Sequence, residues 1–335
     1  MGKSIRVPSR LLSLFFVAAL IAGSLGGVTS GVLRAHVRDS APETAKYVPA
    51  TALAYVTANL DENSNQWKQA NVLGERLGQP ITPSDLFDLF SQTVLGGSGL
   101  IDAKDFLGGD VAFAVTNPDF NALMPSLQTG VSGGGLSSTG IGSAAATAAQ
   151  SGYVLIALPK DPSLAEIALR AALMSIATNN GLTLQQDTQD GITIAYVPGD
   201  EATGMPGFAM ARVDDALIAA PTVKDLVPVL DLRVNGGDSL ADNARFTQVI
   251  RPLPNETLAL GAINGSALST DIGPQADQSL PGLNAITNGI NAFTAFSVTA
   301  VENGFQTDSR SAGIGDGKIF GTADNFDPTF INKMP

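Results

Sequence analysis

Two eleven-residue stretches, PATALAYVTAN at 49–59 and PNETLALGAIN at 254–264, indicate how the folded part of this chain is built. Both begin with proline, carry a Leu-Ala pair at the fifth and sixth positions, and end with asparagine. The apolar runs inside them, 52–58 and 258–263, are typical of β-strands that end at a turn-forming residue. Two related halves are therefore one option for this chain, and chance agreement is the other.

The other periodic segments predict short strands and helices in irregular order. Further strands are predicted at 110–116 and 153–158, and as hairpins at 181–187 with 191–197, 207–213 with 216–220, and 294–301 with 305–311. Their turns are predicted at Asp190-Gly191, Asp214-Asp215 and Glu302-Asn303-Gly304. Helices are predicted at 65–77, from Thr82 onward, and at 161–179, 222–232 and 242–250. Because hairpins are frequent and helices do not alternate regularly with strands, we expect an α+β fold with mostly antiparallel sheets and helices on one face.

The N-terminal segment Leu11–Leu33 predicts a membrane anchor. It is 23 residues long without a charge and follows a leader carrying Lys3, Arg6 and Arg10. As a helix it would span roughly 34 Å, enough for the hydrocarbon core of a bilayer. The basic leader predicts a cytoplasmic N-terminus and an extracytoplasmic body in the cell membrane. The alternative is a signal peptide with its apolar region at Leu11–Ala22, whose cleavage would give a secreted protein.

One face of the predicted anchor carries small residues at a spacing of four: Ala19, Gly23, Gly27 and Gly31. Small residues at this spacing let two membrane helices approach closely, which predicts self-association through this face. The alternative is that glycine is simply common in membrane helices and in signal peptides.

Composition divides the chain into six segments. We expect a leader and transmembrane anchor at 1–34, a polar tether at 35–50, a first α+β half at 51–129, a Gly/Ser/Ala-rich linker or loop at 130–152, a second α+β half at 153–312, and a loosely ordered tail at 313–335. The linker composition cannot bury much apolar surface, and this favours a flexible connection.

The composition also excludes several classes of function. The net charge is −12, and because four basic residues but no acidic residue precede Ala35, the remainder carries −16. Such a body is repelled by nucleic acids and anionic lipid surfaces. There is no cysteine, and the single histidine, His36, lies beside the apolar span. Triads that need histidine, typical zinc sites and His- or Cys-ligated haem are therefore not expected in the body.

Two glycine-rich motifs are better explained as loops than as active sites. Gly130-Val-Ser132-Gly-Gly134 matches a nucleophile elbow but lies in the predicted linker and has no histidine partner. Gly315-Asp-Gly-Lys318 resembles a phosphate loop but lacks the preceding glycine and the following Ser or Thr that the pattern requires.

The polar clusters have an ordinary structural explanation beside each chemical one. Asp61–Asn65 could supply oxygens to Ca²⁺, but it lacks EF-hand spacing and fits a loop that caps the helix at Asn65. The carboxylate pairs Asp200-Glu201 and Asp214-Asp215 could share a proton, but the second pair lies at a predicted hairpin turn. Lys104, Lys160 and Lys224 are isolated lysines that fit ordinary surface positions. Asn255 and Asn264 each begin a sequence that matches the N-glycosylation sequon. We predict no catalytic, cofactor-binding or metal-binding residue.

Four sequence blocks carry a resemblance to a known family. They lie at 48–60, 106–112, 211–219 and 238–243, the last continuing into Phe246. With the membrane segment, these blocks make the chain similar to a family of uncharacterised bacterial exported proteins classed as a domain of unknown function. The resemblance implies a membrane-tethered extracytoplasmic domain and no particular activity.

From these observations we expect a membrane-anchored extracytoplasmic module that binds a partner or helps assemble the envelope without catalysis. One alternative is a carrier of an apolar ligand or lipid, because a curved sheet with helices across one face can enclose a cavity. The other is a carboxylate-dependent hydrolase. The residues do not identify the ligand or the protein partner.

Overall fold

The computed structural model describes residues 38–76, 82–83, 109–116, 152–179, 181–199, 207–267 and 293–312. Some predictions lie outside these ranges and stay predictions. They are the anchor Leu11–Leu33 with its small-residue face, His36, most of the helix from Thr82, Lys104, the motif at Ser132, Asp200-Glu201, Gly315–Lys318 and the tail. Within the described ranges, no helix is long and apolar enough to cross a bilayer. The boundaries of the two predicted halves also stay a prediction.

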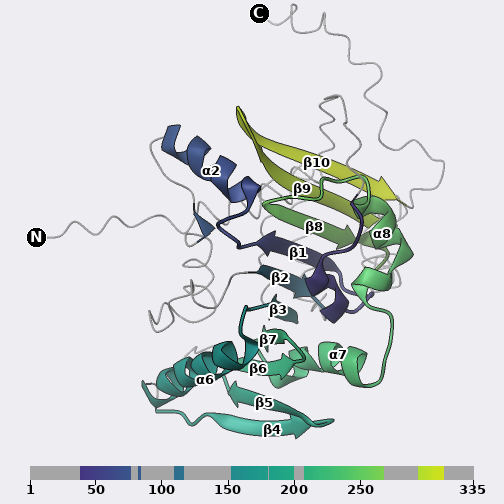
Figure 1. The fold of residues 1–335 in the computed structure, drawn as a ribbon. Coiled ribbons are helices and arrows are strands. Elements are labelled where there is room, and N and C mark those ends of the chain that lie inside the picture. The colour runs from purple at the N-terminus through teal and green to yellow at the C-terminus, as the bar shows by residue number, and fades with distance from the viewer. Residues whose placement is uncertain are drawn as a thin grey trace, which may run out of the picture.

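The described strands form one antiparallel sheet of ten strands, in the order β10-β9-β8-β1-β2-β3-β7-β6-β5-β4 (Figure 1). The strands are β1 Ala54–Asn59, β2 Asp110–Val115, β3 Tyr153–Ala157, β4 Gln185–Gln189, β5 Ile192–Val197, β6 Phe208–Val213, β7 Ala216–Ala220, β8 Ala259–Asn264, β9 Phe293–Val301 and β10 Gly304–Ala312. The predicted α+β fold with antiparallel strands is therefore confirmed, and a single sheet draws strands from both predicted halves.

The helices lie on both faces of the sheet, contrary to the prediction of one covered face. They are α2 Asn65–Arg76, α6 Pro162–Asn179, α7 Val223–Val234 and α8 Ala244–Ile250, with short 3-10 helices η1 Glu43–Tyr47 and η3 Leu240–Asp242. Figure 1 shows α2 and α6 on one side of the sheet and α7 and α8 on the other.

Strand β7 shows the physical reason for helices on two faces. All five of its residues are buried. Ala216 and Ile218 belong to the large core that includes α7, whereas Leu217 packs in a second core with Leu173 of α6. Because successive side chains of a strand point to opposite faces, a strand that is apolar throughout needs cover on both sides.

The three predicted hairpins are confirmed, although the third turn is one residue shorter than predicted because Gly304 already belongs to β10. Asp190 and Gly191 have φ angles of 53° and 83°, and Asp214 has a φ of 52°, as primed two-residue turns require. Their positions give the pairs Gln189 with Ile192 and Val213 with Ala216. Strands β9 and β10 pair from Val301 with Gly304 onward.

The two similar stretches of sequence become neighbouring strands. In the antiparallel pair of β1 and β8, Val56 lies opposite Gly261, and these are the eighth residues of their two stretches. The pairs on either side are related by exchange, Ala54 with Ile263 and Ala58 with Ala259. The two stretches therefore pair about a local two-fold axis.

The neighbouring strands extend this symmetry outward. Val56 lies opposite Phe113 on β2, and Gly261 lies opposite Phe296 on β9. The two Phe residues sit in similar sequences, DVAFAV and FTAFSV. The symmetry brings together segments about 200 residues apart in sequence.

The predicted tether at 35–50 is packed against the body where the structure describes it. In η1, Thr44 and Ala45 are fully buried, and Val48 just beyond it is buried too. Thr44 can be buried because its hydroxyl forms a hydrogen bond of 2.6 Å with the hydroxyl of Tyr55. The predicted tether shows no apolar periodicity in its sequence because only one side of the short helix η1 faces the core.

Candidate functional site

An open pocket of about 360 Å³ lies at one end of the β1–β8 pair. Its lining comes from the loop before β1, the segment around η3 and α8, and the facing ends of β8 and β9. The lining residues are Ala50, Asp238, Asp242, Asn243, Ala244, Arg245, Asn264, Ser266 and Phe293. Four distant parts of the sequence therefore meet here.

Backbone hydrogen bonds join the first of these parts to the second. The amide of Leu240 donates to the carbonyl of Val48 over 2.6 Å, and the amide of Ala50 donates to the carbonyl of Asp238 over 2.9 Å. Between these bonds Pro49 and Ser239 form an isolated β-bridge. The proline that begins the first stretch can occupy this bridge because its neighbours supply the hydrogen bonds.

Two asparagine side chains hold the carbonyl of Ala50. The side-chain amide of Asn264 donates to it over 3.4 Å and that of Asn243 over 3.5 Å. The side-chain oxygen of Asn243 also accepts from the amides of Arg245 and Phe246, so this residue caps α8. These contacts set the position of the pocket wall relative to the sheet.

Asp242 is held by a capping box within η3. Its carboxylate accepts from the hydroxyl of Ser239 over 2.5 Å and from the amide of Ser239 over 3.2 Å. These hydrogen bonds stabilise the ionised form and lower the pKa of Asp242 below its usual value. An acid that stays ionised at neutral pH is a poor proton donor, so Asp242 suits binding rather than acid catalysis.

The rim of the pocket is polar and of mixed charge. Asp238, Asp242 and Arg245 are exposed, and the guanidinium of Arg245 donates to the hydroxyl of Ser266 over 2.9 Å. Phe293 contributes an apolar surface that is almost completely buried. Such a lining offers hydrogen-bond donors and acceptors of both charges to a polar ligand or a protein loop.

The opposite end of the β1–β8 pair is closed by Arg38. Its guanidinium donates to the carbonyls of Pro254 and Asn255, at 3.0 and 2.9 Å, and to the hydroxyl of Thr257 at 3.4 Å. The amide of Arg38 donates to the carbonyl of Arg251 over 2.7 Å. The first described residue is thus held firmly against the loop that precedes β8.

Asp110 lies at this closed end beside Asn59, whose side-chain amide donates to the Asp110 carboxylate over 3.0 Å. Burial raises the pKa of Asp110 above its usual value, although the hydrogen bond from Asn59 and the charge of Arg38 oppose this change. The indole of Trp67 donates to the carbonyl of Asn59, which connects α2 to the same cluster. These contacts give Asp110 a structural role.

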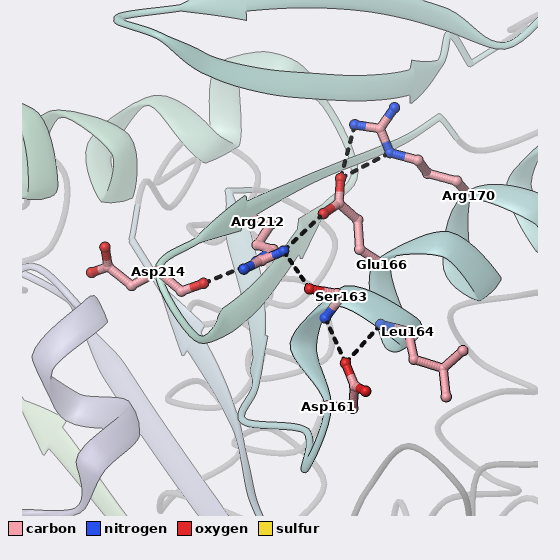
Figure 2. A network of polar contacts seen from close by, with 7 residues as sticks. All are labelled: Asp161, Ser163, Leu164, Glu166, Arg170, Arg212 and Asp214. Atoms are coloured by element: carbon pink, nitrogen blue, oxygen red, sulfur yellow. Dashed lines mark hydrogen bonds and ion pairs between the residues drawn. The ribbon is translucent and has the colours of Figure 1, made fainter.

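The carboxylates of Asp214 and Asp215 lie exposed at the β6–β7 turn. The Asp214 carboxylate makes an ion pair of 2.6 Å with Arg233, and its carbonyl accepts from Arg212 over 3.0 Å. Figure 2 shows Arg212 extending from this turn toward Ser163 and Glu166 of α6. The turn is therefore part of a surface network that connects the β6–β7 hairpin to α6.

The other described candidates also have structural roles or lie on the surface. Asp61 accepts from the amide of Asn63, and Ser64, one residue before the predicted cap, accepts from the amide of Trp67. No cluster of three potential metal ligands occurs in the described ranges. Lys160 and Lys224 are exposed. Asn264 is buried and hydrogen-bonded, so its sequon is not accessible in the folded chain.

Reasoning from sequence did not identify the pocket. In the sequence, the block 238–243 carries only a family resemblance, Ser266 appears only as the end of the sequon that begins at Asn264, and nothing marks Arg245. The one usable signal was the asparagine shared by the two similar stretches, because Asn264 bonds to Ala50 across the pocket wall.

Comparison with known proteins adds a family and no activity. No curated protein matches the chain, and no solved structure does. A family described as "Protein of unknown function (DUF3352)" matches residues 12–306, which is most of the chain. The chain therefore belongs to this family, DUF3352, whose function is unknown.

Proposed function

We propose that this protein is a membrane-anchored, extracytoplasmic module that uses the polar pocket at the end of β1 and β8 to bind a partner without catalysis. The observation that carries this proposal is the pocket itself. Its lining comes from four parts of the chain and presents exposed charges of both signs and two side-chain amides around one concave surface. Ligand sites are typically concave with a few convergent polar groups.

The position of Arg38 supports close tethering to the membrane. Leu33, the last residue of the apolar span, is five residues before Arg38, so at most about 18 Å of chain can separate them. Arg38 in turn is bonded to the 251–257 loop of the body. A body held in this way stays near the bilayer surface in a restricted orientation.

The pocket is open and its lining mixes charged and amide groups with the apolar surface of Phe293, so it does not enclose an apolar ligand and the carrier alternative gains no support from it. The hydrolase alternative needs two carboxylates that converge on a substrate. Asp214, its best candidate, instead forms a surface ion pair with Arg233. We therefore retain binding as the proposed function.

Membrane topology is tested with the full-length protein in intact cells of its host. We expect the protein to remain in the membrane after an alkaline carbonate wash and to be digested by protease added outside the cells. A variant that lacks residues 1–34 should be recovered from the soluble fraction. Protection of the body in intact cells, with digestion only after lysis, would contradict the proposed topology.

Binding is tested with a photo-crosslinking residue at Ala244, an exposed position on the pocket rim. We expect one discrete crosslinked product, which Arg245→Glu abolishes. Gln186→Glu, a charge change on the exposed edge strand β4, serves as the matched control and should leave the product unchanged. If no product forms, or if both charge changes act equally, the pocket is not the binding site.

A further inference from the structure

Helix α6 carries an exposed apolar row. Among the described residues seven large apolar side chains are exposed, and three of them lie on α6: Leu164 at 54 %, Ile167 at 66 % and Met174 at 57 %. Ala171 and Thr178 are exposed on the same helix. The positions 164, 167, 171, 174 and 178 follow the alternating spacing of three and four that forms the seam of a coiled coil.

The exposed row is separate from the side of α6 that packs on the sheet. Ala165, Ala172, Leu173 and Ala177 are buried, and Leu173 packs against the residues of β5–β7. The helix therefore has two apolar faces, one buried against the sheet and one exposed. Helix α7 differs, because its only exposed large apolar residue is Val234 at its C-terminal end.

The few charges of α6 do not oppose contact with another acidic chain. The helix has only two charged side chains, Glu166 and Arg170, which form an ion pair of 3.1 Å. Glu166 also pairs with Arg212 at 3.6 Å. Figure 2 shows this network on one side of the helix, with the side chain of Leu164 pointing away from it.

The exposed row of one α6 helix can pack against the same row of a second α6 helix that runs in the opposite direction. If two copies of α6 pack antiparallel with Ala171 at the crossing point, Ile167 of each copy faces Met174 of the other, and Leu164 faces Thr178. The small Ala171 lets the helices approach, and the larger side chains fill the space on either side. This is the arrangement that a two-fold contact between identical surfaces requires.

From these four observations we infer that α6 is a contact surface for a second copy of this chain, paired antiparallel about Ala171. This inference goes beyond the proposed binding function, and it rests on that proposal only for the membrane anchoring. One helix row buries less surface than the roughly 1,200 Å² of stable interfaces, so the contact is weak between free chains. Anchoring in a shared membrane would strengthen it by raising the effective concentration.

Cysteine crosslinking tests the geometry, because the full-length chain has no cysteine of its own. In membranes, Ala171→Cys should form a disulfide-linked dimer, as should a mixture of Ile167→Cys and Met174→Cys chains. The matched control is Val72→Cys on α2, a position 47 % exposed, which should stay monomeric. A 167–167 crosslink stronger than the 167–174 crosslink would overturn the antiparallel arrangement.

Dimer affinity of the purified full-length protein in detergent gives a second, independent test. Ile167→Glu should weaken dimerisation at least ten-fold in sedimentation equilibrium, because it places two carboxylates in the apolar contact. Val72→Glu adds the same charge to an exposed apolar position of α2 and should change affinity less than two-fold. Equal effects of the two substitutions would overturn the inference. So would a parent protein that is monomeric and does not crosslink at Ala171, and in that case the exposed row contacts a different partner or another segment of the chain.

Discussion

The two ends of the β1–β8 pair are related by a local two-fold axis, yet one is closed and the other is an open pocket. Each strand ends at an asparagine, Asn59 or Asn264. Asn59 lies opposite Asp110, whereas the equivalent partner of Asn264 is Phe293. The carboxylate of Asp110 accepts a hydrogen bond from the side-chain amide of Asn59 near Arg38. The phenyl ring of Phe293 offers no acceptor, so the side-chain amide of Asn264 donates to the backbone carbonyl of Ala50 instead. The replacement of Asp110 by Phe293 at the equivalent position thus distinguishes the closed end from the end that carries the candidate binding site.

The largest effect is expected at the two-fold axis itself. A Cβ at Gly261 would lie 2.1 Å from the ring of Phe296, so Gly261→Val should lower the free energy of unfolding by about 3 kcal/mol or more. Its symmetry mate already carries a side chain, and Val56→Ala should cost only about 1 kcal/mol. Urea unfolding of both variants measures this asymmetry. Adding Phe296→Ala should recover part of the loss in Gly261→Val, and a cost below 1 kcal/mol for Gly261→Val would contradict this packing.

The next effect separates the closed end from the open one. Arg38→Met should cost about 2 kcal/mol, because it leaves the carbonyls of Pro254 and Asn255 without their donor. Arg245→Met removes the same charge from the pocket rim and should change stability by less than about 0.5 kcal/mol. Similar costs at the two arginines in urea unfolding would show that the ends are not organised as described.

The two asparagines should show a smaller difference in the same direction. Asn59→Ala should cost about 2 kcal/mol, because the half-buried carboxylate of Asp110 loses its donor. Asn264→Ala should cost about 1 kcal/mol, because it removes one bond to Ala50 and one from the amide of Ala267. Thermal unfolding at constant pH ranks the two, and the reverse order would count against the assigned partners.

The smallest effects are opposite pH dependences of the two aspartates. The raised pKa of Asp110 means that it favours folding below its usual pKa of 3.8, and that this contribution is lost as pH rises through the folded-state pKa. The lowered pKa of Asp242 means that its contribution is present above 3.8 and is lost as pH falls through the folded-state pKa. The stability of Asp110→Asn relative to the parent chain should therefore be higher at pH 7 than at pH 3.

Asp242→Asn should show the reverse, with its loss of stability largest at pH 7 and smallest at pH 3. Unfolding in urea at pH 3, 5 and 7 measures both variants under the same conditions. Two curves that shift in the same direction with pH would contradict the assignment of one aspartate to each environment.

Much of the fold could be predicted because the signals are local. Asp190-Gly191 and Asp214-Asp215 predict hairpins, since Asp190, Gly191 and Asp214 accept the positive φ that the turns need. Thr222 predicts the start of α7, where it accepts from the amide of Asp225. The sides on which the helices lie could not be predicted, because strands such as β7 are apolar on both faces and give no direction.

The sequence by itself determined where strands, turns and caps occur, because each depends on a few adjacent residues. It also excluded histidine- and cysteine-based chemistry from the body by composition alone. The tertiary structure decided that Ala50, Asp238, Asn264 and Phe293 share one pocket and that Leu164 and Met174 stay outside the core. These outcomes depend on strand register and helix placement between segments as far apart in sequence as Ala50 and Phe293, which no local pattern records.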